Sequence, residues 1–343
     1  MTSEKPKLHI DSLLFAGNEI LIDIDHSYRA VVAKAVQIYL EQAVGLPPSH
    51  EPLITLDDVI LLQKKGRFTN YWDLTTAFIM YFVEMLPPVP VPTFPSKFHI
   101  PGLMAYLQMA GGNLRISINT LRDKRDIARL AEDIDAAGGG LDGAHHVLPR
   151  ENRHMLVSSG EITKTNVLAR VFQALYLGST LFAAMYSQPA FVVHNGGHCK
   201  NETLVIKAEV LAALSEKMPL GVISDRPRHE VEQSLKAQQI APYFQTVVAL
   251  EDIKQGQAKP VPDAWPLLEA AKRLSGSGKQ SAYVGANVGD IQAAKAANET
   301  QPFTAIGCVI GTPDKPALRQ AFEACKANII LGHPNHLKEL IFG

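Results

Sequence analysis

The second half of the chain alternates short apolar segments with helix-length segments, and this order constrains the fold more than any other feature. The strand-like segments are residues 220–223, 246–249, 281–284, 304–310 and 329–331. The helix-length segments are residues 228–239, 263–274, 290–298 and 317–327, with a closing helix after the last strand. Strands joined through helices lie parallel with right-handed crossovers. The sequence therefore predicts an α/β fold with a doubly wound parallel sheet.

A long insert separates one further apolar strand, at residues 8–15, from this series. The insert opens with an amphipathic helix predicted at 27–42, with Ser27 as its N-cap, and helical periodicity recurs up to residue 215. The Pro-rich residues 87–101 predict a rigid connector, and the glycine-rich residues 138–153 predict a flexible loop.

These patterns predict two domains. The α/β core comprises residues 8–27 and 216–343, and a helical domain comprises residues 28–215. Ligands of open parallel sheets bind at the carboxyl ends of the strands. The sequence therefore places a binding site at that edge of the core.

The overall charge excludes binding modes that depend on a strong electrostatic field. Thirty-three Lys and Arg against 34 Asp and Glu give a net charge of -1, so neither nucleic acid nor an anionic membrane is an expected partner. The start of the chain lacks the pattern of a signal peptide, and no apolar run approaches membrane-spanning length, so a cytoplasmic location is expected. The sequence does not predict the oligomeric state.

Neither the cysteines nor one histidine pair indicates a metal site. The chain has 3 cysteines without C-x-x-C spacing, which favours reduced side chains over a disulfide framework or a zinc site. His194 and His198 are four residues apart but enclose a Gly-Gly turn, so they do not share a helix face. We expect no metal there.

Four short motifs occur at residues 13–23, 221–224, 258–262 and 283–291. They resemble, in order, an apolar strand before D-x-D-G-[TV]-[LIV]-x-D, an apolar strand ending in Ser or Thr, K-P-x-P, and V-G-D-x-x-x-D-I. These are the patterns of the haloacid dehalogenase-like phosphohydrolases of subfamily I. The resemblance implies a Rossmann-like core with an inserted helical cap domain. It also implies phosphatase chemistry at the carboxyl ends of the strands.

The chain departs from these motifs at the positions that carry the chemistry. The family's nucleophilic Asp corresponds to Ala16, its acid/base Asp to Asn18, and a metal-binding Asp to Ala286. A methyl group can neither attack phosphorus nor bind Mg²⁺, and an amide does not titrate. Asp290 is left as an alternative metal ligand or as the cap of the following helix. The resemblance therefore predicts a protein without a functional catalytic residue and without a metal cofactor.

The residues that would bind an anion are retained. Ser224 offers a hydroxyl group, Arg226 and Lys259 offer positive charges, and Asn18 offers an amide. We therefore expect a phosphorylated small molecule or a partner protein as the ligand.

An alternative alignment takes Asp23 and Asp25 as the catalytic pair of an active, divergent, Mg²⁺-dependent phosphatase. Two features argue against it. The strand before Asp23 would be interrupted by Gly17 and Asn18, and the predicted helix at Ser27 leaves little room for the turn that follows the second Asp.

Overall fold

The chain divides into two compact units. The computed structural model describes residues 9–87, 105, 107–109, 116–148, 157, 160–275 and 279–343. One unit contains Met1–Ile24 and Glu202–Gly343, and the other contains Asp25–Asn201. The sequence placed the boundaries after residues 27 and 215. The second boundary comes earlier in the structure because the segment after Glu202 pairs and packs within the first unit.

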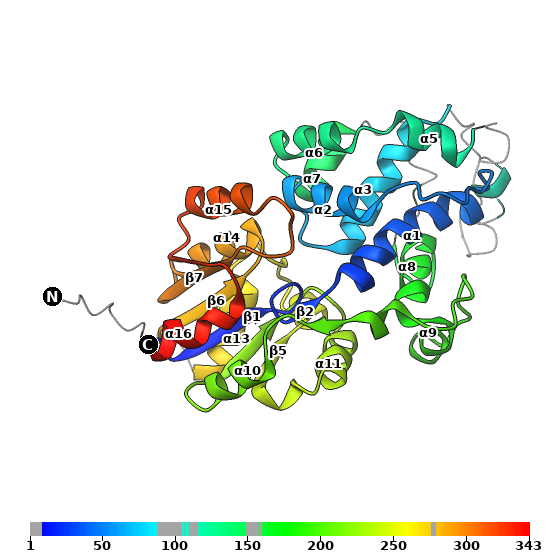
Figure 1. Cartoon of the computed structure of the whole chain (residues 1–343). Helices are drawn as coiled ribbons and strands as arrows, with labels where there is room; N and C mark the ends of the chain where they lie inside the picture. The colour runs from blue at the N-terminus through cyan, green and yellow to red at the C-terminus, as the bar shows by residue number, and fades with distance from the viewer. Residues whose placement is uncertain are drawn as a thin grey trace. The chain divides into compact units, whose positions relative to one another are not determined.

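The first unit is an α/β unit built on a parallel sheet of six strands, in the order β5-β4-β1-β6-β7-β8 (Figure 1). The strands are β1 (Ser12–Ala16), β4 (Leu220–Ile223), β5 (Phe244–Val248), β6 (Ser281–Gly285), β7 (Phe303–Cys308) and β8 (Ile329–Leu331). The predicted fold class is thereby confirmed. Among the described residues of this unit, β2 (Ile22–Asp23) and β3 (Thr203–Leu204) form a further, antiparallel ribbon.

Helices connect the strands of this sheet, and one further helix follows the last strand, β8. They are α10 (Ala208–Ser215), α11 (Arg228–Ala237), α12 (Leu250–Gln255), α13 (Trp265–Ser275), α14 (Val288–Ala297), α15 (Lys315–Ala324) and α16 (Leu337–Phe342). Helix α13 packs on β1, β4 and β5, and α14 packs on β6 and β7. The two helices also contact each other, so they share one face of the sheet.

The central strands of the sheet are fully buried, which explains the continuous apolar runs in the sequence. Every residue of β1 is buried, as is every residue of β4, β6 and β7. Strands covered on both faces need apolar side chains on both sides. Among the described residues, β1 begins at Ser12, later than the predicted residue 8, and it continues through Ala16.

The second unit is helical among its described residues. Its α-helices are α1 (Ala30–Ile38), α2 (Leu56–Lys65), α3 (Tyr71–Glu84), α5 (Ile118–Lys124), α6 (Ile127–Ala136), α7 (Gly140–Val147), α8 (Val167–Leu177) and α9 (Ser179–Tyr186). The side chain of Tyr28 packs against the rings of Tyr71, Phe172 and Tyr176. This aromatic cluster joins the start of the unit to α3 and α8.

Two predictions in this unit were wrong in detail. The first helix starts as a π-helical segment, η1 (Asp25–Arg29), so Ser27 lies inside it and is not an N-cap. The Asp25–Arg29 ion pair, 2.5 Å, spans this segment. The predicted loop at 138–153 contains helix α7, while residues 149–153 lie outside the described residues. The Pro-rich connector also lies outside them, apart from Pro87.

We find no helix in the described ranges with the length and apolar character needed to cross a bilayer.

Candidate functional site

The carboxyl ends of β1 and β4 bring the first two motifs together. Strand β1 ends at Ala16, whose residue surface is 8% exposed. Immediately afterwards, the Gly17 amide donates to the carbonyl oxygen of Ile223 at 2.9 Å. A Cβ added to Gly17 would lie 3.4 Å from the Cβ of Ser224. Gly17, the residue after Ala16, therefore lies next to Ser224, so the first two motifs meet at this edge of the sheet.

Arg226 lies buried beside the turn that follows β1. Its Nη1 donates to Oδ1 of Asn18 at 3.3 Å, and its Nη2 donates to Oγ of Ser234 at 3.0 Å. Two carboxylates flank the same guanidinium group, Glu202 at 3.2 Å and Glu230 at 3.7 Å. Burying a charge is costly unless it is paired and hydrogen-bonded, and this shell supplies both conditions. Arg226 is thus committed to an internal network.

Ser224 and Lys259 differ in their surroundings. Ser224 is buried, and its Oγ accepts a hydrogen bond from the Arg226 amide at 3.2 Å. Lys259 is exposed and forms no ion pair with a residue that the structure describes. Of the two predicted cationic ligands of an anion, Lys259 is therefore the one whose charge remains available.

Helix α14 uses Asp290 as a cap. The carboxylate accepts three hydrogen bonds, from the Tyr283 hydroxyl at 2.9 Å, the Ala286 amide at 3.0 Å and the Asn287 amide at 2.9 Å. Burial raises the pKa of Asp290, the neighbouring Glu19 carboxylate adds to this rise, and the hydrogen bonds oppose it. Burial also raises the pKa of Tyr283, which Asp290 raises further, so the phenol remains a proton donor.

Gly285 makes this cap fit. A Cβ added there would lie 2.1 Å from the Cβ of Asp290 and 2.6 Å from its Oδ2. Any larger side chain at position 285 would collide with Asp290 and prevent its carboxylate from reaching the amides of Ala286 and Asn287.

Glu19 is a buried carboxylate at this edge that the sequence analysis did not single out. It is 3% exposed and has a φ of 66°, and its Oε2 accepts a hydrogen bond from Nδ2 of Asn287 at 3.2 Å. The family's first motif has Gly at this position. A charged residue in place of Gly was the available signal.

The alternative catalytic pair lies elsewhere. Asp23 belongs to β2, where it pairs with Thr203 in the antiparallel ribbon. Asp25 begins η1 in the helical unit and pairs with Arg29. Neither residue ends a strand of the six-stranded sheet.

The residues present do not fit the divalent metal of the related phosphatases. Ala16 and Ala286 offer no oxygen from their side chains, and both oxygens of Asp290 already accept hydrogen bonds. The main-chain oxygen of Asn18 accepts from the Ile20 amide at 2.8 Å. Within the described ranges, no group of three or more His, Cys, Asp or Glu side chains could hold a metal ion. Mg²⁺ requires several oxygen ligands in near-octahedral geometry.

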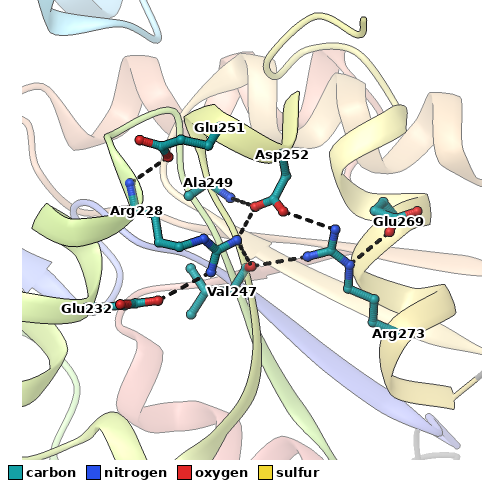
Figure 2. Close-up of polar contacts among 8 residues, drawn as sticks. All are labelled: Arg228, Glu232, Val247, Ala249, Glu251, Asp252, Glu269 and Arg273. Carbon is teal, nitrogen blue, oxygen red and sulfur yellow. Dashed lines mark hydrogen bonds and ion pairs between the residues drawn. The ribbon is translucent and has the colours of Figure 1, made fainter. Parts of the chain in front are cut away.

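A second polar network fixes the start of α12, which leads into the segment with Lys259. Figure 2 shows Asp252 between Arg228 and Arg273, with further partners around them. Asp252 also accepts from the Ala249 amide at 2.8 Å, and both arginines reach the carbonyl oxygen of Val247. The segment with Lys259 lies between α12 and α13, and the network ties these two helices together.

This arrangement, a buried parallel sheet with polar residues after β1, β4 and β6, is a doubly wound α/β core with its candidate site at the carboxyl ends of the strands. Residues 197–301 match the family model described as haloacid dehalogenase-like hydrolase. That match includes Ser224, Lys259 and Ala286 but not Ala16. The match confirms the resemblance for the second, third and fourth motifs, so residues 197–301 of the α/β unit are haloacid dehalogenase-like, while the first motif at residues 13–23 lies outside the match.

Curated relatives match over a limited length. The phosphoglycolate phosphatase of Escherichia coli (strain K12) is 42% identical over 91 residues, which are 26% of this chain and 34% of that protein. The phosphoglycolate phosphatase of Salmonella paratyphi A is 38% identical over 91 residues. The matched part therefore spans 34% of the length of these relatives.

Solved structures show the same fold over nearly the whole chain. An X-ray structure of a Northeast Structural Genomics Consortium target has a TM-score of 0.60 at 16% identity and covers 97% of this chain and 98% of its own. A putative phosphoglycolate phosphatase from Lactobacillus delbrueckii subsp. bulgaricus has a TM-score of 0.53 at 13% identity and covers 97% of this chain and 99% of its own. At such low identity these likenesses concern the fold alone.

Proposed function

We propose that this chain is a haloacid dehalogenase-like protein that has lost Mg²⁺-dependent phosphohydrolase activity and binds a phosphorylated small molecule. The observation that carries the proposal is Ala16 at the end of the central strand β1. Removing a catalytic nucleophile commonly lowers the rate by about 10⁴- to 10⁶-fold. Asn18 and Ala286 remove the acid/base and a metal ligand as well, so no part of the phosphoryl-transfer machinery compensates.

The ligand contacts of this proposal are Ser224 and Lys259. Ser224 lies beside Gly17 at the carboxyl edge of the sheet, where ligands of this sheet type bind. Lys259 supplies the positive charge, because Arg226 is already shared between Glu202 and Glu230. Both contact residues fall within the segment that matches the family model.

A turnover assay tests the loss of activity. We expect metal-free protein supplied with Mg²⁺ to release no phosphate from 2-phosphoglycolate above the rate without protein. Turnover that disappears in Asp23→Asn would instead support the divergent phosphatase. Turnover unaffected by Asp23→Asn and Asp25→Asn would contradict both assignments.

Calorimetric titration tests the binding. We expect 2-phosphoglycolate to bind and glycolate, which lacks the phosphate, not to bind. Lys259→Ala should weaken binding about tenfold, as expected for the loss of one charged hydrogen bond. Lys254→Ala is the matched control, because Lys254 is an exposed lysine on α12. Equal binding of glycolate, or equal losses in both lysine variants, would argue against the phosphate site.

A further inference from the structure

Three strand-end loops meet at the side chain of Glu19. Glu19 follows β1, Asn287 follows β6, and Gly311 follows β7. Asn287 donates to Oε2 of Glu19, and a Cβ added to Gly311 would lie 3.2 Å from the carboxyl carbon of Glu19. Gly311 itself has a φ of 69°, which favours glycine. The carboxylate is therefore enclosed by the loops of three different strands.

Glu19 occupies this place at a cost. Its φ of 66° lies in the left-handed region, which non-glycine residues seldom adopt. Its carboxylate is buried and close enough to Asp290 to raise the pKa of that group. Glycine would avoid both penalties. The contacts of the Glu19 side chain must offset them.

We propose that the Glu19 carboxylate stands in for the divalent cation of the related phosphatases, as a fixed cross-link between the loops after β1, β6 and β7. In those enzymes the cation joins the first motif to the fourth motif. Here the Glu19–Asn287 hydrogen bond joins the same two loops directly. The inference rests on the proposed loss of metal-dependent activity and assigns it a structural replacement.

The cross-link also keeps Mg²⁺ out. A cation entering this region would have to displace the Asn287 side chain from Glu19 and the hydrogen-bond donors of Asp290. Mg²⁺ gives up its water molecules reluctantly and demands strict geometry. Oxygens already supplied with protein N–H and O–H donors are poor competitors for its hydration shell.

Restoring the metal carboxylates with and without Glu19 tests the replacement. One variant carries Ala16→Asp and Ala286→Asp, and a second adds Glu19→Gly. Calorimetry and the melting temperature of metal-free protein report Mg²⁺ binding. We expect Mg²⁺ to bind and raise the Tm only in the second variant, and neither effect in the first variant or the wild type. The matched control adds Glu299→Gly, at an exposed turn, to Ala16→Asp and Ala286→Asp in place of Glu19→Gly. This control should not bind Mg²⁺.

Equal Mg²⁺ binding with Glu19 present, or Mg²⁺ binding by the wild type, would overturn the inference. Mg²⁺ binding by the wild type without turnover would leave the proposed function intact. Conversely, a titration in which 2-phosphoglycolate does not bind the wild type would contradict the proposed function and leave the cross-link standing.

A double-mutant cycle tests the cross-link should the added carboxylates prevent folding. Glu19→Ala and Asn287→Ala each remove one partner of the hydrogen bond and are each expected to lower the Tm by about 2–4 °C. Because both remove the same contact, the double variant should lose less than the sum of the two changes. Additive losses would show that the two side chains do not act together and would overturn the inference.

Discussion

The Arg226 guanidinium donates to the side-chain oxygen of Asn18 at 3.3 Å and so joins the turn after β1 to the segment after β4. The same group is paired with Glu202, the first residue of the chain after it returns to the α/β unit. A residue expected from the sequence to face a ligand thus belongs to the internal structure of the site.

Arg226→Met should strongly destabilise the protein. The change leaves the buried carboxylates of Glu202 and Glu230 without their cation, and breaking a buried pair costs about 3–5 kcal/mol. Urea unfolding of the purified variant measures this loss. Arg319→Met, on the exposed face of α15, should change the free energy of unfolding by no more than about 0.5 kcal/mol. Adding Glu202→Gln to Arg226→Met should recover part of the loss, and failure to recover any would contradict the charge argument.

Gly285→Ala should cost about 1–3 kcal/mol, because overpacking forces side chains and backbone to shift. The new methyl group would overlap the Asp290 side chain at 2.1 Å and dislodge the cap of α14. Gly332→Ala is the matched control, because the atom nearest to a Cβ added at Gly332 is 3.8 Å away. Chemical denaturation of both variants should separate them. A stability loss at position 332 as large as that at 285 would contradict the packing explanation.

Asp252 should make the stability pH-dependent in the acid range. Burial alone would raise its pKa, but hydrogen bonds from Ala249 and Arg273 and the charges of Arg228 and Arg273 lower it below its ordinary value of 3.8. As the pH falls below 3.8, the unfolded chain therefore takes up the proton first. The stabilisation by Asp252 is present above that pH and is lost as the pH falls through the folded-state pKa.

The stability difference between the wild type and Asp252→Asn should consequently shrink as urea titrations move from neutral pH down through 3.8. Glu323→Gln, on the exposed side of α15, serves as the control and should show a small difference throughout. A difference for Asp252→Asn that does not vary with pH would rule out the ionised carboxylate as its cause.

His198 should weaken the helical unit at mildly acidic pH. Its Nε2 lies 3.1 Å from Nζ of Lys34, an ammonium group that can only donate, so Nε2 accepts and Nδ1–H donates to the His26 carbonyl oxygen. Burial lowers the pKa of His198, and Lys34 and His194 lower it further, while the His26 carbonyl opposes them. Below pH 6.5, the ordinary value, the unfolded chain binds the proton first, so stability falls.

The Tm of the wild type, measured at a series of pH values across 6.5, should therefore fall as the pH falls. His198→Gln should reduce this slope of Tm against pH. The exposed His50 provides the control, and His50→Gln should leave the slope unchanged. An equal slope in the wild type and His198→Gln would assign the acid sensitivity to other groups.

The regular alternation of strands and helices could be predicted from the sequence because it follows from local periodicity. The bounds predicted for β4, residues 220–223, and for β8, residues 329–331, agree with the structure. Helix ends were less accurate where a π-helical segment or a cap intervened. The helix α14 was predicted to start at residue 290 but starts at Val288, because Asn287 is its N-cap.

The sequence by itself determined the α/β class, the order of the motifs and the chemical identity of Ala16, Asn18 and Ala286, since each depends only on residue type and spacing. Only the tertiary structure decided that Arg226 pairs with Glu202 and that Glu19 meets Asn287. These contacts join residues from different strand ends, and their partners depend on strand order and loop conformation. Local patterns contain neither, because parallel crossovers bring together segments that are far apart in the chain.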